Sequence, residues 1–343
     1  MKFSIRLLIL AWLTLLAPCF AADVIAHRGA SGQLPEHSLV ATAYAHASGA
    51  DYIEQDVVLS RDGVPIVLHD IELDTTTNVA EIFPKRARPD GRYYAIDFDL
   101  AELKTLELHE RIKTKTGQPV YPQRFPVQHI GLRIPTLAEQ ITLIQGLNKS
   151  TTTNVGIYPE IKAPAWHRAQ GQDISAIVLK TLADFGYSKR SHGAYLQCFD
   201  AKETLRIRTE LGSDLKLVQL IAENAWRESD TDYDWLKTAD GLKHVASYAD
   251  GIGPWWPQVI NDQQQASTLL KHAQQLGLVV HPYTFRADDL PPWADSYQHW
   301  LAQYLQTLGV DGVFTDFPMQ TRLIIMNLYR SRLEPYESRL SSE

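Results

Sequence analysis

Eight short apolar, β-prone runs recur along the chain, and helix-like segments separate them. Strands that alternate with helices are normally parallel and joined by crossovers, and eight is the number that closes a barrel. The sequence therefore predicts an α/β fold, a (β/α)8 TIM barrel. The expected strands are Asp23–His27, Tyr52–Leu59, Val155–Ile161, Ala194–Phe199, Leu215–Ile221, Ala249–Gly253, Leu278–Tyr283 and Gly312–Thr315.

Helices are expected after most of these strands. Thr136 with Glu139 three residues later has the pattern of a capping box, and glycines follow the ends of several helical segments. The expected helices are Pro35–Ser48, one that begins at Thr136, Asp173–Phe185, Lys202–Leu211, part of 230–246, Gln263–Gln275, Ser296–Leu308 and Met319–Tyr329.

The alternation of strands and helices is interrupted between the second and third expected strands. Asp62-Gly63 is a hairpin signal that folds Val64–Leu68 back beside the second strand. Residues 71–135 follow, with scattered prolines and mixed charges, and they predict a small inserted subdomain near the barrel mouth.

Residues 1–21 have the pattern of a secretory signal peptide. Lys2 and Arg6 form its charged start, Leu7–Ala17 its apolar middle, and Cys19-Phe20-Ala21 a small-x-small cleavage site. We therefore expect a mature barrel domain of residues 22–343 in the periplasm. Cys19 raises the alternative of a lipoprotein anchor, which Pro18 fits poorly. The apolar run is too short for a comfortable membrane span, so no stable membrane insertion is expected.

Ionisable residues gather at the ends of the first strands. His27, Glu54, Asp56 and His69 all occupy such positions, where barrel enzymes place their active sites. Glu54 and Asp56 are two apart on one strand and share a face, so a divalent cation would offset their repulsion. The histidines could act as general acid and base. Each feature alone is more often structural, and the combination favours a site.

A later strand end adds Glu160 and Lys162. Three carboxylates without a thiolate suit Ca²⁺ or Mg²⁺ rather than zinc. With a divalent cation, Arg28 and Lys162, the site would carry a charge of about +1, which complements one phosphodiester. The net charge of −7 argues against a nucleic-acid partner and requires local positive charge to attract an anionic substrate. No phosphate-binding loop pattern indicates nucleotide chemistry.

The chain resembles the glycerophosphodiester phosphodiesterase family of the bacterial periplasmic type, over essentially all of its mature length. The motifs that carry the resemblance are His27-Arg28-Gly29-Ala30, Glu54-Gln55-Asp56, Leu68-His69-Asp70, Tyr158-Pro159-Glu160-Ile161-Lys162, Tyr195-Leu196-Gln197-Cys198-Phe199-Asp200, His281-Pro282-Tyr283 and Phe314-Thr315-Asp316-Phe317-Pro318.

This resemblance implies a (β/α)8 barrel that hydrolyses glycerophosphodiesters to glycerol 3-phosphate and an alcohol. It assigns acid and base roles to His27 and His69, phosphate binding to Arg28 and Lys162, and one divalent cation, Ca²⁺ first and Mg²⁺ as the alternative. The implied metal ligands are Glu54, Asp56 and Glu160. Which histidine is the acid, and whether the protein forms a homodimer, stay open.

Three weaker candidates complete the site. Gln197 either hydrogen-bonds phosphate or glycerol, or is satisfied within the barrel. Tyr283 and Trp255 either pack around the substrate or serve only the barrel mouth. Two rival functions are a phospholipid-cleaving lipase on the same barrel and a periplasmic protein that binds phosphodiesters without cleaving them.

Overall fold

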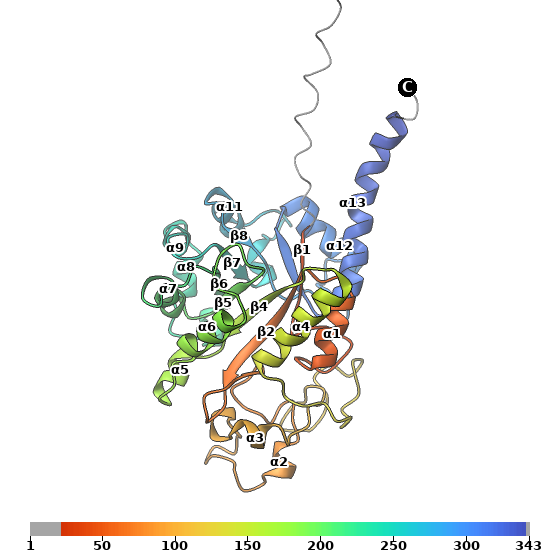
Figure 1. Ribbon diagram of the computed structural model, residues 1–343. Coiled ribbons are helices and arrows are strands. Elements are labelled where there is room, and N and C mark those ends of the chain that lie inside the picture. The colour runs from red at the N-terminus through yellow and green to blue at the C-terminus, as the bar shows by residue number, and fades with distance from the viewer. Residues whose placement is uncertain (1–21, 341–343) are drawn as a thin grey trace, which may run out of the picture.

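Eight parallel strands form a barrel at the centre of the molecule, with helices around it (Figure 1). The computed structural model describes residues 22–340. The neighbour order β8-β7-β6-β5-β4-β2-β1-β9 confirms the predicted fold. The strands are β1 (Asp23–Ala26), β2 (Tyr52–Leu59), β4 (Gly156–Ile161), β5 (Tyr195–Cys198), β6 (Lys216–Ile221), β7 (Gly251–Pro254), β8 (Val279–Val280) and β9 (Gly312–Thr315).

The barrel is nearly closed at a loose seam between β8 and β9. Four backbone hydrogen bonds of 2.8–3.2 Å cross it, from Asp311 to Val280, Phe314 to Pro282, Phe285 to Phe314, and Asp316 to Phe285. The expected strand Leu278–Tyr283 is reduced to two residues. Pro282 has no N–H to donate, so the ladder cannot continue regularly through it.

The predicted hairpin is present. β3 (Pro65–Val67) pairs antiparallel with the end of β2, so that Val57 faces Val67 and Leu59 faces Pro65. The turn uses a left-handed Gly63, with φ of 75°. This short strand directs His69 toward the mouth of the barrel.

The helices confirm most of the expected elements and shift several boundaries. The longer ones are α1 (Leu39–Ala47), α4 (Leu137–Thr151), α6 (Ile174–Asp184), α7 (Ala201–Thr209), α9 (Ala239–Val245), α11 (Thr268–Gln275), α12 (Tyr297–Ala302), η3 (Gln303–Leu308) and α13 (Pro318–Leu340). The shorter ones are α2 (Val79–Ile82), η1 (Ala95–Asp97), α3 (Leu100–Leu103), α5 (Pro164–Ala169), η2 (Asn224–Trp226), α8 (Tyr233–Leu236) and α10 (Trp256–Val259). The capping box at Thr136 is confirmed.

Two expected helices begin later than the sequence suggested. The helix expected from Pro35 begins at Leu39, because the Ser38 side chain caps it and His37 has a left-handed φ of 61°. The helix expected from Gln263 begins at Thr268, where Ser267 caps the first turn. Capping side chains therefore fix both starts, and the residues before them form turns.

Residues 68–136, the β3–α4 segment, form a small separate cluster. Leu73, Phe98, Leu106 and Ile134 are among its buried hydrophobic residues. Figure 1 shows the segment, coloured orange to yellow and containing α2 and α3, beyond the arrowhead of β2. It thus lies at the C-terminal end of the barrel strands.

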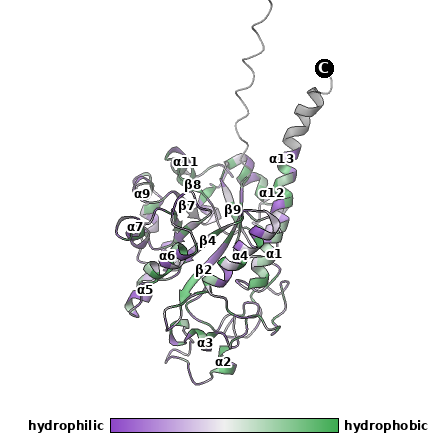
Figure 2. Ribbon diagram, in the orientation of Figure 1, coloured by the Kyte–Doolittle hydropathy of each residue, from purple (hydrophilic) through white to green (hydrophobic). Residues whose placement is uncertain are grey.

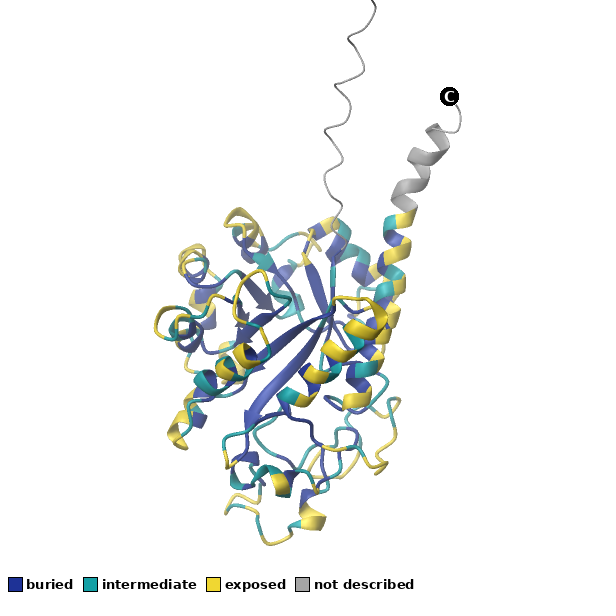
Figure 3. Ribbon diagram, viewed as in Figure 1, coloured by how far each residue is buried: buried dark blue, intermediate teal, exposed yellow. Residues whose placement is uncertain are grey.

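The main core lies between the strands and the surrounding helices. β2 is buried along almost its whole length, and much of it is hydrophobic (Figure 2). Exposed residues gather on the outer faces of the helices (Figure 3). Inside the barrel, the stacked rings of Tyr158 and Tyr195 lie 4.8 Å apart beside Phe314, so the interior is packed rather than open.

The predicted signal peptide lies outside the described residues. Within residues 22–340, no helix combines the length and apolar character that a bilayer crossing requires. Cys198 is a buried free thiol, as expected of a small hydrophobic residue there.

Candidate active site

The structure gathers all the predicted site residues around one cavity of about 240 Å³ at the C-terminal ends of the strands. Those residues are His27, Arg28, Glu54, Asp56, His69, Glu160, Lys162, Gln197 and Tyr283. The remaining lining comes from Phe199, Leu220, Trp226, Glu228, Trp255, Thr284, Arg286 and Phe314. The cavity lining therefore combines ionic side chains with aromatic ones.

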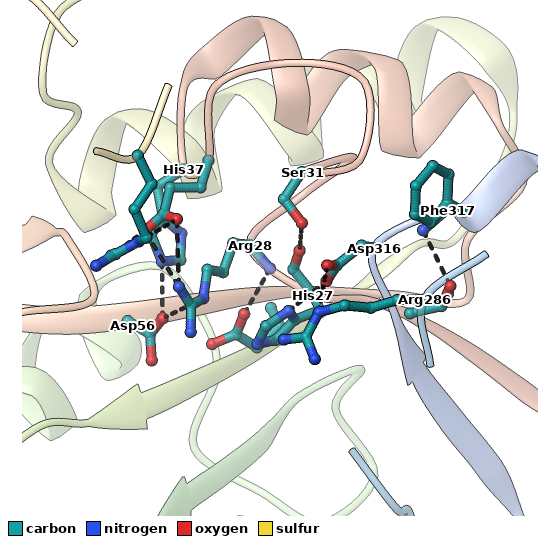
Figure 4. Close-up of polar contacts among 12 residues, drawn as sticks. His27, Arg28, Ser31, His37, Asp56, Arg286, Asp316 and Phe317 are labelled. Atoms are coloured by element: carbon teal, nitrogen blue, oxygen red, sulfur yellow. Dashed lines mark hydrogen bonds and ion pairs between the residues drawn. The ribbon is translucent and has the colours of Figure 1, made fainter. Parts of the chain in front are cut away.

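His27 follows β1 and is held by a carboxylate from the opposite end of the chain. Its Nδ1 lies 2.6 Å from Oδ1 of Asp316, and Arg286 donates to the other oxygen of Asp316 at 2.9 Å (Figure 4). Burial lowers the pKa of His27 to about 4, with a further lowering from the charge of Arg28, although Asp316 opposes both. The Asp316 contact leaves Nε2 as the nitrogen for proton transfer.

His69 has a similar partner. Its Nδ1 lies 2.5 Å from Oδ1 of Asp70, and Thr75 donates its hydroxyl to the second oxygen at 2.6 Å. Burial lowers the pKa of His69 to about 3, and the charges of Arg28 and Lys162 add to this. Both histidines are therefore neutral near pH 7 and oriented through Nδ1, which fits them for proton transfer through Nε2.

The carboxylates of β2 form a candidate metal site with a histidine that the sequence analysis did not single out. One ligand atom each from His37, Glu54 and Asp56 lies within 4.8 Å of the others, and all three residues are buried. The Nε2 atom of His37 lies 2.8 Å from Asp56. Burial and the charge of Asp56 raise the pKa of Glu54 well above its usual value. A bound cation would relieve this repulsion.

Arg28 is anchored by the same carboxylates. Its backbone N–H donates to Glu54 at 2.6 Å, and its Nε lies 3.4 Å from Asp56. Figure 4 shows its side chain extending from the end of β1 toward Asp56, on the other side of His27 from Asp316. The arginine thus lies between the candidate metal site and the predicted catalytic histidine.

Glu160 lies across from Asp56 in the β2–β4 register, but it is not in the three-residue cluster. Its Oε1 pairs with Lys162 Nζ at 2.7 Å. Burial raises the pKa of Glu160 to about 8, against the lowering effect of Lys162. Its assignment as a metal ligand stays a prediction.

The donor set fits a divalent cation. It offers the buried carboxylate oxygens of Glu54 and Asp56 together with a ring nitrogen of His37. Oxygen-rich sites of this kind suit hard cations.

Gln197 and Tyr283 differ in what they can offer a substrate. The Oε1 atom of Gln197 is buried and has no hydrogen-bond partner within the described chain, so local satisfaction does not account for it. Tyr283 donates its hydroxyl to the Ile221 carbonyl at 2.9 Å and presents its ring to the cavity. Gln197 thus offers a polar contact to a substrate, and Tyr283 is part of the wall.

The sequence analysis assigned no role to several residues that support the site. Asp316 and Asp70 stand in motifs that carry the family resemblance, directly after Thr315 and His69, so their positions carried a signal. His37 lies in a turn, and Arg111 and Arg124 lie in the β3–α4 segment, where no periodicity points to them.

Comparison with known proteins identifies the family of the chain. Residues 27–320 match the glycerophosphoryl diester phosphodiesterase family. The chain is 45% identical to a glycerophosphodiester phosphodiesterase of Haemophilus influenzae, covering 86% of this chain and 87% of that protein. It is 37% identical to a Treponema pallidum protein of the same name, covering 86% and 89%.

A solved structure shows the same fold. An Oleispira antarctica phosphodiesterase, solved in complex with the product sn-glycerol-3-phosphate, has a TM-score of 0.60 at 23% identity, covering 89% of this chain and 97% of that one. Because the family match spans most of the chain, this protein belongs to the glycerophosphoryl diester phosphodiesterase family.

Proposed function

We propose that this glycerophosphodiester phosphodiesterase hydrolyses its substrate to sn-glycerol 3-phosphate and an alcohol, with His27 and His69 transferring protons beside a bound divalent cation. The observation that carries the proposal is the convergence of two histidine–aspartate pairs and a buried carboxylate cluster on one cavity. No other arrangement on the described chain joins proton-transfer groups to a candidate cation site.

The two histidine–aspartate pairs suit acid–base chemistry. A neutral imidazole accepts a proton from the nucleophile, which is either water or the glycerol hydroxyl of the substrate with water opening the cyclic phosphate afterwards, and its aspartate stabilises the imidazolium that forms. The partner histidine donates a proton to the departing alcohol oxygen, and a bound anionic phosphate favours its protonated form. The hydrogen bonds to Asp316 and Asp70 favour the protonated forms of His27 and His69, respectively.

Arg28 and Lys162 are the groups for the phosphate. Both line the cavity near the carboxylates. Each carries a positive charge and can donate a charge-assisted hydrogen bond to a phosphoryl oxygen. Glu54 and Asp56 would hold the cation, with His37 or Glu160 as the third protein ligand. A bound divalent cation supplies Lewis-acid polarisation of the phosphoryl oxygens.

The proposal also covers the metal, the product, the localisation and the oligomeric state. Ca²⁺ is proposed first, as the family resemblance implies, with Mg²⁺ as the alternative, because carboxylate oxygens suit either hard cation. The phosphodiesterase of Oleispira antarctica holds sn-glycerol-3-phosphate as its product, which supports the same product here. The pattern of residues 1–21 supports export to the periplasm. A homodimer stays a prediction.

The test measures glycerol 3-phosphate released from glycerophosphocholine by the protein of residues 22–343. The assay is run as prepared, after chelation, and after addition of Ca²⁺ or Mg²⁺. Loss of release on chelation and its return with one ion would support the reaction and identify the metal. Release that is insensitive to chelation would overturn the metal role, and no release under any condition would overturn the proposed substrate.

A further inference from the structure

The β3–α4 segment contributes two arginines with largely buried side chains, and each contacts the aspartate of one histidine–aspartate pair. Arg111 donates from Nη1 to Oδ2 of Asp70 at 2.7 Å, on the oxygen that His69 does not use. Arg124 places Nη2 2.8 Å from Oδ2 of Asp316, again opposite the oxygen that meets His27. Only 15% of the Arg111 side chain and 4% of the Arg124 side chain is exposed.

Each arginine is itself fixed by a second carboxylate. Arg111 donates hydrogen bonds to Glu36 from Nε at 2.9 Å and from Nη2 at 2.6 Å. Glu36 also accepts a hydrogen bond from Arg28 at 3.2 Å. Arg124 donates hydrogen bonds to Asp288 from Nε at 2.8 Å and from Nη2 at 3.1 Å. Two-point contacts of this kind fix the plane of the guanidinium group.

Arg124 is also held by its own segment. Its guanidinium lies 3.7 Å from the ring centroid of Tyr121, so stacking adds to the ion pairs. The arginine therefore reaches the barrel mouth in one orientation.

We propose that the β3–α4 segment is a positioning element for catalysis, in which Arg111 and Arg124 fix Asp70 and Asp316 and, through them, the rings of His69 and His27. This inference rests on the proposed acid–base function. A carboxylate held only through the oxygen that meets histidine can turn about its terminal bond. An arginine on the other oxygen prevents this rotation and keeps the histidine in line with the cavity.

The two arginines, each with the aspartate that it contacts, differ in how many other contacts hold that aspartate. Asp316 keeps a contact to Arg286 at 2.9 Å if Arg124 is removed, whereas Asp70 keeps only the neutral Thr75 hydroxyl at 2.6 Å if Arg111 is removed. Loss of Arg111 also frees Glu36, the partner of Arg28. Removal of Arg111 should therefore disturb the site more than removal of Arg124.

The test compares Arg111→Gln, Arg111→Lys, Arg124→Gln and Arg124→Lys by steady-state kinetics on glycerophosphocholine. The matched control is Arg88→Gln, since Arg88 makes a two-point pair with Asp97 at 2.7 and 2.8 Å in the same segment, without lining the cavity. We expect kcat to fall by about 10- to 100-fold for Arg111→Gln and less for Arg124→Gln. We expect Arg88→Gln to keep wild-type kcat, and each lysine variant to recover part of the loss.

A purely structural role makes a different prediction. It would lower the thermal midpoint of the arginine variants but leave kcat per folded molecule unchanged. Unchanged kcat in folded Arg111→Gln and Arg124→Gln would overturn the inference, as would an equal loss in Arg88→Gln. If a glutamine variant does not fold, its lysine variant decides: a kcat equal to wild type contradicts the inference, and a reduced kcat supports it. An inactive wild type would instead refute the proposed function.

Discussion

The Nδ1 atom of His27 lies 2.6 Å from Oδ1 of Asp316, although 289 positions separate the two residues along the chain. Closure of the barrel brings them together, because β1 pairs with β9 in a register that places Ala26 beside Thr315. The orientation of the predicted catalytic ring therefore depends on the fold as a whole.

Replacement of either histidine should abolish turnover. His27→Ala and His69→Ala each remove a proton-transfer group, so kcat should fall by about 10²- to 10⁴-fold, with the circular dichroism spectrum unchanged. His244→Ala, on the exposed face of α9, should keep wild-type kcat. If both site variants stay active, the acid–base assignment is wrong.

Asp316→Asn should lower kcat by about 10²-fold or more, because the amide neither fixes the reactive form of His27 nor stabilises its cation. Asp316 raises the pKa of His27 through its hydrogen bond and charge, so the variant should shift to lower pH the limb of the kcat/KM profile that reports His27: the acidic limb if His27 is the base, the basic limb if it is the acid. The profile is measured between about pH 3 and pH 9. A profile with both limbs unmoved would contradict the role of Asp316.

The third protein ligand of the cation can be identified by a pair of variants. If Glu160 binds the cation, Glu160→Gln should weaken metal binding by about tenfold or more, while His37→Ala should have the larger effect if His37 binds instead. Isothermal titration of the chelated protein with Ca²⁺ measures both. An unchanged titration for Glu160→Gln would remove Glu160 from the ligand set.

Acid should destabilise the protein partly through His27. Burial lowers its pKa from an ordinary value of 6.5 to about 4, so the unfolded chain binds the proton more tightly. The stability that this neutral histidine contributes is complete above about pH 6.5 and is lost as the pH falls toward 4. Between pH 7 and pH 5 the loss should be about 2 kcal/mol.

Urea unfolding of the chelated protein at those two pH values measures this effect. His27→Gln should lose less stability than wild type over the same interval, while His244→Gln should follow wild type. Equal pH dependence in wild type and His27→Gln would show that His27 is not buried in its neutral form.

Gln197→Ala should raise KM by about tenfold with a smaller effect on kcat, because Gln197 lines the cavity that the substrate would fill and its buried Oε1 has no hydrogen-bond partner among residues 22–340. Steady-state kinetics on glycerophosphocholine measures the two constants separately. A KM equal to wild type would mean that Gln197 serves only the barrel interior.

The sequence by itself determined the strands, their parallel arrangement and the residues at their C-terminal ends. Periodicity and turn residues act over a few positions, so β2 and β9 have the expected bounds. Because the C-terminal ends of parallel strands meet at one mouth, the positions of His27, Glu54 and Lys162 along the chain sufficed to assign them to one site. Local patterns also predicted the hairpin that directs His69.

The tertiary structure alone decided which partners these residues have. His37 hydrogen-bonds Asp56 from a left-handed backbone position, and Glu160 pairs with Lys162. Arg111 and Arg124 reach the site from a segment without helical or strand periodicity. Their placement depends on the docking of that segment against the barrel mouth, which is set by packing and charge between distant residues rather than by any local pattern.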